Sequence, residues 1–218
     1  MKILCLYNNI CALELFEWVR KQGHGAVFCT EKIGAEWCRD QKFDLAISYT
    51  YRYILPQEVL DALGNNAVNL HNSFLPWNRG ADPNIWSIID GTPRGVTLHY
   101  MDAGLDSGDI IAQAVVPYKR EDTLETSYGR LDLEAKKLFK DAFRYYPFWR
   151  AMGKKAEGKG TYHSKKDGAS IRGIIDTYNV NVEEFRTKAL ELVRGGAFPA
   201  VRNLVFSLLV KGCVQHEP

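Results

Sequence analysis

The pattern of hydrophobic and polar positions along the chain predicts an alternation of strands and helices. Short apolar runs bounded by polar residues or glycine are typical of buried strands, and apolar residues at helical spacing are typical of amphipathic helices. Strands are expected at Lys2–Tyr7, Ala26–Cys29, Asp44–Ser48, Ala67–Leu70, Gly95–Met101 and Asp109–Val116. Helices are expected at Ala12–Lys21, Ile33–Arg39, Gln57–Leu63, Asp82–Ile89, Asp122–Phe143 and Val182–Val193. This alternation implies right-handed crossovers and a doubly wound, mostly parallel sheet of the α/β class.

The same pattern divides the chain into a large domain and a small appendage. Glycines and lysines between Gly153 and Gly168 are typical of a linker. We therefore expect a domain over residues 1–150, a linker over 151–170 and a small α+β appendage over 171–218. The appendage would hold the last helix and two β-prone runs, Val201–Phe206 and Leu208–Val210.

Composition narrows the classes of protein. The chain has 218 residues, of which 46% are hydrophobic, so it is long enough to bury a sizeable core. A net charge of +2 without a long block of like charges lacks the basic field of a nucleic-acid binder. The first residues, MKILCLYNN, predict a strand rather than a signal peptide, and no run is apolar enough for a membrane span. A cytoplasmic protein without nucleic-acid or membrane partners is expected.

Cysteine and glycine spacing argues against metal and dinucleotide chemistry. The five cysteines, an odd number, lack any C-x-x-C spacing, which favours reduced, structural thiols and no metal site. The first strand is followed by LYNNICAL, which has no glycine-rich loop to hold a pyrophosphate. A dehydrogenase is therefore disfavoured.

The candidate chemistry lies between Ala67 and Gln113. Asn69 and His71 are two positions apart in a predicted strand, so their side chains point to the same face. The turn-like segment after Met101 can bring Asp106 back toward His71. By itself an Asn-x-His pair is weak evidence, because a histidine at a strand end is more often a satisfied structural residue.

Three segments, NLHNSFLPWNRG, GVTLHYMD and GLDSGDIIAQ, resemble signatures of the 10-formyltetrahydrofolate-dependent formyltransferases. The resemblance is strongest over residues 44–113 and extends more weakly to about Asp167. It assigns the family's catalytic triad to Asn69, His71 and Asp106, and WNRG is most similar to the sugar N-formyltransferases. One departure is Asn72, which stands where the family usually has proline. The chain lacks the glycine-rich phosphate loop of the glycinamide ribonucleotide branch.

The resemblance also implies binding residues around the triad. The formyl donor, 10-formyltetrahydrofolate, would contact Tyr53, Ile54 and Leu55 on one side and Met101, Asp102 and Leu105 on the other. On the acceptor side the candidates are Trp77, Asn78 and Arg79 in the loop after His71, although ordinary core packing is the more frequent role of a residue such as Trp77. The guanidinium of Arg79 suits a phosphate, although a salt bridge within the loop is an equal alternative.

The triad residues suit formyl transfer to an amine. His71 can act as a base for the incoming amine or stabilise the oxyanion, Asp106 can fix the imidazole, and the Asn69 amide can donate to the oxyanion. No metal is required. The resemblance thus implies transfer of a formyl group to a nucleotide-linked deoxyamino sugar, with dTDP as the expected nucleotide, in surface polysaccharide (O-antigen) biosynthesis, and by a homodimer.

Two alternatives stay open beside this interpretation. A methionyl-tRNA or other small-amine formyltransferase would use the same triad, although the short C-terminal part and the low net charge disfavour a tRNA substrate. A non-catalytic module that binds folate or a sugar nucleotide would be expected to lose part of the triad. Outside the triad we expect His99 to support the site, Trp86 to belong to the core and Asp82 to cap its helix; His24, His163 and His216 receive no role.

Overall fold

The protein, as a computed structural model, is described over residues 1–193 and is built on one six-stranded sheet. The strand order is β2-β1-β3-β4-β6-β7. These strands are β1 (Lys2–Leu6), β2 (Gly25–Cys29), β3 (Leu45–Tyr49), β4 (Ala67–His71), β6 (Gly95–Tyr100) and β7 (Ile110–Val115). The first four run parallel, whereas β6 and β7 are antiparallel to their neighbours. The expected mostly parallel α/β sheet is confirmed.

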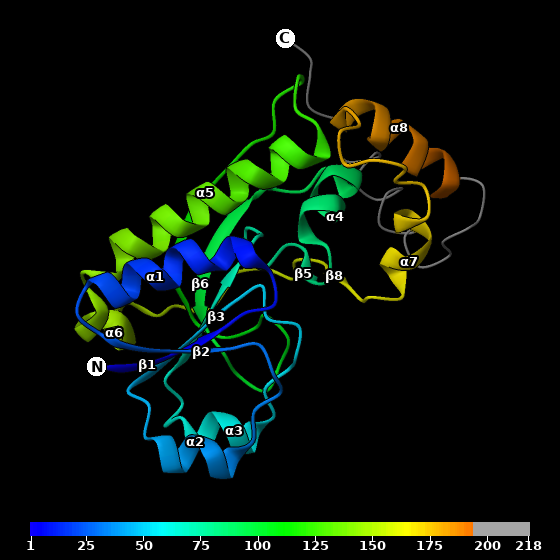
Figure 1. Cartoon of the computed structure of the whole chain (residues 1–218). Coiled ribbons are helices and arrows are strands. Elements are labelled where there is room, and N and C mark those ends of the chain that lie inside the picture. The colour runs from blue at the N-terminus through cyan, green and yellow to red at the C-terminus, as the bar shows by residue number, and fades with distance from the viewer. Residues whose placement is uncertain (194–218) are drawn as a thin grey trace.

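Helices cover both faces of the sheet (Figure 1). α1 (Leu13–Lys21) and α5 (Leu124–Phe143) lie on one face, and α2 (Ala35–Gln41) and α3 (Gln57–Ala62) lie on the other. Their apolar stripes bury two separate hydrophobic clusters, one under α1 and α5 and one under α2 and α3. Because β4 lies inside the sheet, its apolar residues are covered on both sides and its carboxyl end is free to carry polar side chains.

A third cluster lies beside the sheet and joins segments that the sequence pattern had separated. α4 (Pro83–Asp90) packs against α8 (Val182–Leu192), and α7 (Asp167–Arg172) contributes Ile171 to the same core. Trp86 is fully buried there, as expected of a core residue. Residues 171–193 therefore share a hydrophobic core with the first part of the chain.

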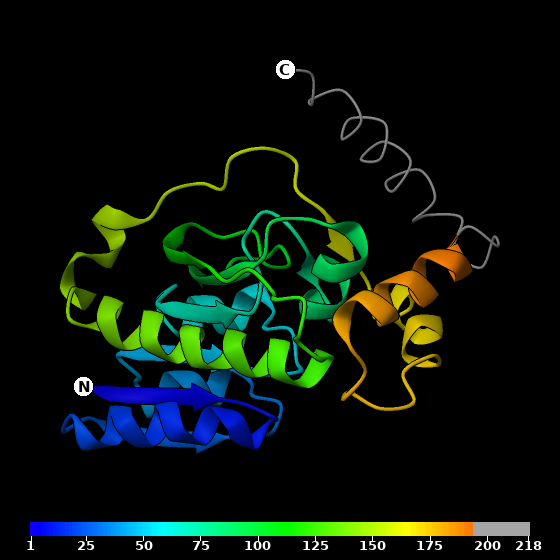
Figure 2. The ribbon, with the colours of Figure 1, turned by 90° about the horizontal axis from the view of Figure 1, so that it is seen from above.

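The segment expected to be a linker contains ordered structure. After the 3₁₀ turn Tyr146–Phe148 and α6 (Trp149–Met152), the chain crosses the molecule to β8 (Tyr162–His163), as Figure 2 shows. There β8 pairs in parallel with β5 (Arg79–Gly80) in a second, two-stranded sheet. The glycines and lysines do mark the crossing, but the crossing ends in buried residues, because Thr161 and His163 are almost inaccessible to solvent.

The ends of two helices differ in how they are capped. Thr123 caps α5 as its position suggests, and Thr126 completes a reciprocal capping box. Asp82 occupies the N-cap position of α4, as expected, but with a φ of 52° its carboxylate pairs with Arg172 and forms no capping bond to the helix amides. The contact from α7 therefore determines the orientation of this side chain.

Three remaining predictions concern the C-terminal strands, the cysteines and membrane spans. The strands expected at Val201–Phe206 and Leu208–Val210 lie outside the described residues. The four cysteines within residues 1–193 are free. No helix in that part of the chain has the length and apolarity needed to cross a membrane.

Candidate active site

The carboxyl half of β4 presents polar side chains at the centre of the sheet. Asn69 pairs in register with His99 on β6, and His71, the last residue of the strand, pairs with Thr97. The alternation of the strand puts Val68 and Leu70 into the core and leaves Asn69 and His71 on the opposite face. The two side chains therefore share one face, as the spacing predicts.

The loop between β6 and β7 returns Asp106 to this face. Gly108 is required for the return, because a Cβ atom there would lie 1.9 Å from the carbonyl oxygen of Tyr100. Asp102 stiffens the loop by accepting hydrogen bonds from the Gly104 amide and the Ser107 hydroxyl. Asp106 itself has a φ of 50°, a left-handed conformation that aspartate tolerates better than most residues.

Asn69, His71 and Asp106 come together, as predicted. The amide nitrogen of Asn69 donates to Oδ1 of Asp106 over 3.2 Å, and Nε2 of His71 lies 3.6 Å from Oδ2. His99 lies on the other side of the carboxylate, with Nε2 3.5 Å from Oδ1 of Asp106 and 3.3 Å from the Asn69 amide. The structure thus places His99 beside the triad, where a supporting residue was expected.

The carboxyl group of Asp106 is stabilised as a carboxylate. Burial alone would raise its pKa, since only 9% of the side chain is exposed. The neighbouring imidazoles of His71 and His99 and the backbone amide of Gly80, which donates over 2.9 Å, outweigh burial and hold the pKa well below its usual range. The site therefore contains a buried negative charge.

Hydrogen-bond partners determine which nitrogen of His71 carries the proton. Nε2 lies 3.2 Å from the backbone carbonyl oxygen of Asn78. Carbonyl and carboxylate oxygens only accept, so Nε2 bears the hydrogen and the lone pair of the neutral ring is on Nδ1. For His99, Nδ1 lies 2.8 Å from the carbonyl oxygen of Tyr100, while Nε2 faces both the Asn69 amide nitrogen and the Asp106 carboxylate.

The residues expected to hold the formyl donor form two loops beside the triad. Leu55 and Met101 pack in the same hydrophobic cluster, which brings the loop after β3 and the loop after β6 together. The Leu55 side chain is buried, so Leu55 itself can offer a ligand mainly its backbone. Ile54 and Leu105 are exposed apolar side chains, and such side chains suit the flat ring of a pterin.

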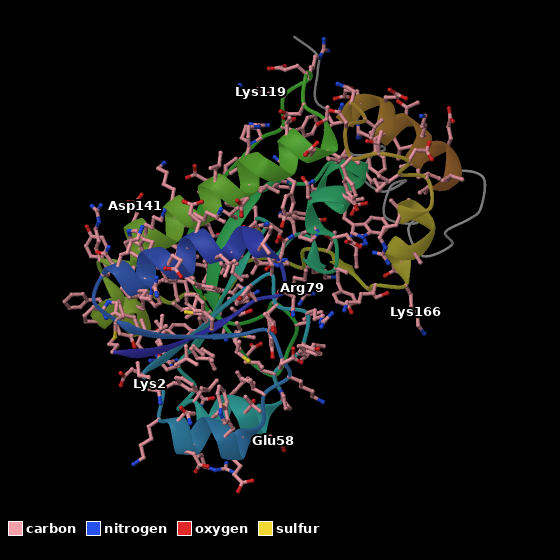
Figure 3. The ribbon with its side chains drawn as sticks, viewed as in Figure 1. Lys2, Glu58, Arg79, Lys119, Asp141 and Lys166 are labelled. Carbon is pink, nitrogen blue, oxygen red and sulfur yellow. The ribbon has the colours of Figure 1, made fainter. Side chains whose placement is uncertain are left out.

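The acceptor loop gives its three predicted residues different environments. Trp77 is half-buried, and Arg79 keeps a buried Nε atom that has no hydrogen-bond partner among the described residues. Arg79 lies toward the middle of the molecule, whereas Glu58, Asp141 and Lys166 lie at the periphery (Figure 3). The side chain of Asn78 does not fit the expected substrate contact, because it is fully buried. Its amide group is already hydrogen-bonded to the hydroxyl groups of Thr92 and Thr161.

Asn72, the departure from the family pattern, follows His71 directly and is buried. Its Oδ1 atom has no hydrogen-bond partner in the described part of the chain. The substitution leaves the triad geometry in place. Within residues 1–193, no group of three or more His, Cys, Asp or Glu side chains is arranged to hold a metal ion.

Sequence reasoning missed the contribution of residues 160–163. Thr161 and His163 are buried beside the acceptor loop, and His163 bonds Asp90 over 2.8 Å while its ring stacks on Trp86. The only signal in the sequence is the pair of residues Thr161 and His163 two positions apart, which is too weak to detect inside a segment rich in lysine and glycine.

A doubly wound sheet that brings a histidine, an amide and a carboxylate together at the carboxyl end of a central strand combines an acid–base group with a hydrogen-bond donor. A family model described as formyl transferase matches residues 30–143, which is more than half of the chain. The chain belongs to the formyltransferase family.

The relatives include sugar and tRNA formyltransferases. The dTDP-4-amino-4,6-dideoxyglucose formyltransferase of Mycobacterium tuberculosis is 35% identical over 137 residues, which cover 62% of this chain and 56% of the relative. The methionyl-tRNA formyltransferase of Lysinibacillus sphaericus is 39% identical over 99 residues, covering 45% of this chain and 32% of the relative. The chain thus spans about half the length of these curated relatives, or less.

Among solved structures, the formyltransferase PseJ from Anoxybacillus kamchatkensis is similar over most of the chain. The TM-score is 0.75 at 35% sequence identity, and the match covers 85% of this chain and 97% of PseJ. The PseJ crystal structure is a complex with UDP-4,6-dideoxy-4-formamido-L-AltNAc and tetrahydrofolate. The similarity therefore extends beyond the part matched by the family model.

Proposed function

We propose that the protein is an N-formyltransferase that transfers the formyl group of 10-formyltetrahydrofolate to the amino group of a nucleotide-linked deoxyamino sugar. The observation that carries the proposal is the convergence of Asn69, His71 and Asp106 at the end of β4, with contacts of 3.2 and 3.6 Å to the carboxylate. It is supported by the similarity to PseJ, which covers nearly all of that sugar formyltransferase.

The acceptor is proposed to carry a nucleoside diphosphate. The two relatives at 35% identity are named for or bound to a dTDP-linked 4-amino sugar and a UDP-linked 4-formamido sugar, whereas two neighbours at 21% identity act on or bind 3-amino sugars. The buried, unpaired Nε atom of Arg79 lies in the acceptor loop and suits a phosphate oxygen. Uridine therefore joins thymidine as a candidate nucleotide, and the C4 amine is favoured over the C3 amine.

Proton transfer in this mechanism belongs to His71. The bound donor supplies an electrophilic formyl carbon on N10. The lone pair on Nδ1 of His71 accepts a proton as the amine nitrogen forms its bond to that carbon, and the imidazolium returns a proton to N10 as the bond from carbon to N10 breaks. Asp106 stabilises the imidazolium from the Nε2 side, where its carboxylate lies 3.6 Å away.

Asn69 stabilises the oxyanion of the tetrahedral intermediate. In the resting site its two N–H bonds face Asp106 and His99. One of these bonds is redirected to the oxyanion when the formyl group is in place.

A panel assay tests the proposed function. The protein is incubated with 10-formyltetrahydrofolate and UDP-, dTDP- and GDP-linked 3-amino and 4-amino deoxy sugars, and tetrahydrofolate release is followed together with the mass of the acceptor. We expect one formamido sugar to form per tetrahydrofolate released. His71→Asn is the matched control and should lose about 10²-fold or more of the activity. Absence of turnover on every sugar would refute the sugar acceptor.

A second candidate is favoured by one observation, the 39% identity to a methionyl-tRNA formyltransferase over 99 residues. Charged initiator tRNA and small primary amines are therefore included in the panel. Activity on these alone would keep the triad chemistry and replace the acceptor. Binding of the folate or sugar nucleotide without any transfer would identify a non-catalytic binding module.

The family resemblance alone carries two further predictions, homodimerisation and a role in surface polysaccharide synthesis. The cytoplasmic location stays a prediction from the sequence.

A further inference from the structure

Residues 161–163, which lie outside the region matched by the family model, are hydrogen-bonded to the acceptor loop, residues 76–81. The Thr161 amide donates to the carbonyl oxygen of Pro76 over 3.2 Å, and the Thr161 carbonyl accepts from the Arg79 amide over 3.0 Å. One step further along, the Ala81 amide donates to the carbonyl oxygen of His163 over 2.9 Å. These three bonds join two stretches of chain that are far apart in the sequence; Asn78 and Thr161, for example, are 83 positions apart.

The backbones of β5 and β8 approach closely, and the side chain of His163 on β8 is held by residues of α4. A Cβ atom on Gly80 would lie 2.3 Å from the carbonyl oxygen of His163, so only glycine allows this approach. The His163 imidazole contacts the buried carboxylate of Asp90 over 2.8 Å, and its ring stacks on Trp86 with centroids 4.0 Å apart. The position of β8 is thereby set by α4.

The side chain of Thr161 also forms hydrogen bonds to one residue of the loop, Asn78. Its hydroxyl oxygen accepts from the Asn78 backbone amide over 2.8 Å and donates to Oδ1 of Asn78 over 3.2 Å. The hydroxyl is buried, as is the whole of Asn78. Asn78 has a φ of 54°, a left-handed conformation, so the two bonds to Thr161 help to hold a peptide orientation that the backbone alone does not favour.

The Asn78 peptide in turn faces the proposed acid–base residue. Its carbonyl oxygen is 3.2 Å from Nε2 of His71, and two residues later the Gly80 amide donates to Asp106 over 2.9 Å. A continuous path therefore runs from the Thr161 hydroxyl through Asn78 to the imidazole, with no link longer than 3.2 Å.

We propose that Thr161 is a positioning residue for His71: its hydroxyl bonds the amide and the side chain of Asn78 and so holds the left-handed conformation in which the Asn78 carbonyl oxygen keeps the imidazole proton on Nε2 and leaves the lone pair on Nδ1. The catalytic meaning of this inference rests on the proposed function. Without the hydroxyl, the Asn78 amide and side-chain oxygen lose a buried partner, and the left-handed conformation of Asn78 is held less firmly. Its carbonyl oxygen, which lies nearer to Nε2 of His71 than the Asp106 carboxylate does, then shifts away from the imidazole.

Histidine tautomers in the resting protein test this inference without any substrate. We would record ¹⁵N-imidazole spectra of the wild type, Thr161→Val and Thr161→Ser at a pH where the rings are neutral, with His71→Asn to assign the signal. Valine keeps the volume and removes the hydroxyl, and serine keeps the hydroxyl. We expect a clear fall in the Nε2–H fraction of His71 in Thr161→Val and recovery in Thr161→Ser. An unchanged tautomer in Thr161→Val overturns the inference.

Kinetics with the acceptor found in the panel assay give a second measurement. Thr161→Val is expected to lower kcat about 10-fold to 100-fold with little change in KM for the acceptor, because a small displacement of a reacting group has effects of this size. Ser87→Ala is the matched control: it removes another buried hydroxyl, which bonds the Asn84 carbonyl in α4. A change in KM alone, or an equal loss of kcat in the control, contradicts a positioning role.

The role of Thr161 can still be tested if Thr161→Val does not fold or if the panel assay finds no acceptor. If circular dichroism shows that Thr161→Val does not fold, Thr161→Cys takes its place, because a thiol keeps the volume but forms weak hydrogen bonds. The same fall in the Nε2–H fraction is then expected. If no acceptor is turned over, the proposed function fails while the tautomer spectra still decide the role of Thr161.

Discussion

Two buried carboxylates on opposite faces of the sheet have contrasting surroundings. Asp132 on α5 accepts from the Tyr49 hydroxyl over 2.7 Å and pairs with Lys136 over 2.7 Å. Asp106 is as deeply buried, with 9% of its side chain exposed against 14% for Asp132, but its side-chain contacts are 3.2 Å or longer. One carboxylate is tightly bonded on both oxygens, and the other has one short bond, to a backbone amide.

The difference is consistent with a structural role for Asp132 and with the proposed catalytic role of Asp106. Burial lowers the pKa of Lys136, but its bonds to Asp132 and Glu14 more than compensate and raise it, so this pair is fixed as ions. Around Asp106 the imidazoles are close enough to stabilise the charge and far enough to move toward a reacting group. Loose contacts of this kind are typical of catalytic groups before the substrate binds.

The largest expected effect is on activity. Asp106→Asn keeps the shape of the side chain and removes the charge that faces His71 and His99. We expect kcat to fall about 10²-fold to 10⁴-fold. The free energy of unfolding should fall as well, because the two imidazoles and the Gly80 amide stabilise the charged carboxylate in the folded protein. Steady-state assays and thermal unfolding of the same preparation check both parts. A large loss of stability with intact activity would give Asp106 the structural role.

The opposite result is expected for Asp132→Asn. Lys136 then keeps only the partly exposed Glu14 as an ionic partner, and we expect unfolding to become easier by about 2–4 kcal/mol. Activity at a temperature where the variant is folded should stay within about 2-fold of the wild type. Urea unfolding measures the first quantity. A large loss of kcat in the folded variant would show that the two carboxylates are coupled across the sheet.

A smaller change on the same face sharpens this result. Tyr49→Phe removes one hydrogen bond to Asp132 and leaves the ion pair with Lys136 in place. The expected cost is about 1 kcal/mol in the free energy of unfolding, the usual value for one hydrogen bond. Urea unfolding beside Asp132→Asn measures the ratio of the two effects. An equal loss in both variants would mean that the ion pair adds nothing.

The smallest expected effect concerns pH. The folded-state pKa of Asp106 lies below the value of about 3.9 for an unfolded chain, so its charge contributes stability above that pH. The contribution is lost as the pH falls from there through the folded-state pKa. The difference in unfolding free energy between the wild type and Asp106→Asn should therefore shrink between about pH 5 and pH 3. A difference that grows on acidification would contradict the assigned direction.

The sequence contained the parts of this site that lie in or beside regular strands. The alternation in β4 placed Asn69 and His71 on one face, and turn residues after β6 brought Asp106 back to them. Local patterns determine such positions, because the side chains of a strand alternate with a fixed period and because Gly108 lets the loop after β6 pass close to the backbone of Tyr100.

The contribution of Thr161 could not be predicted in the same way. It depends on a contact with Asn78 across 83 positions, inside a stretch whose glycines and lysines are typical of a linker. The buried state of Asn78 was missed for the same reason, since its partners Thr92 and Thr161 come from different segments. Tertiary contacts of this kind leave no periodic pattern in the sequence.

The most direct test of the account compares tetrahydrofolate release by the wild type and Asp106→Asn in the presence of 10-formyltetrahydrofolate and a UDP- or dTDP-linked 4-amino sugar, with Asp132→Asn as the matched control. We predict stoichiometric formamido product with the wild type and with the control, and a loss of about 10²-fold or more with Asp106→Asn. Equal rates in all three proteins, or a loss confined to Asp132→Asn, would contradict the assignment of the chemistry to the carboxyl end of β4.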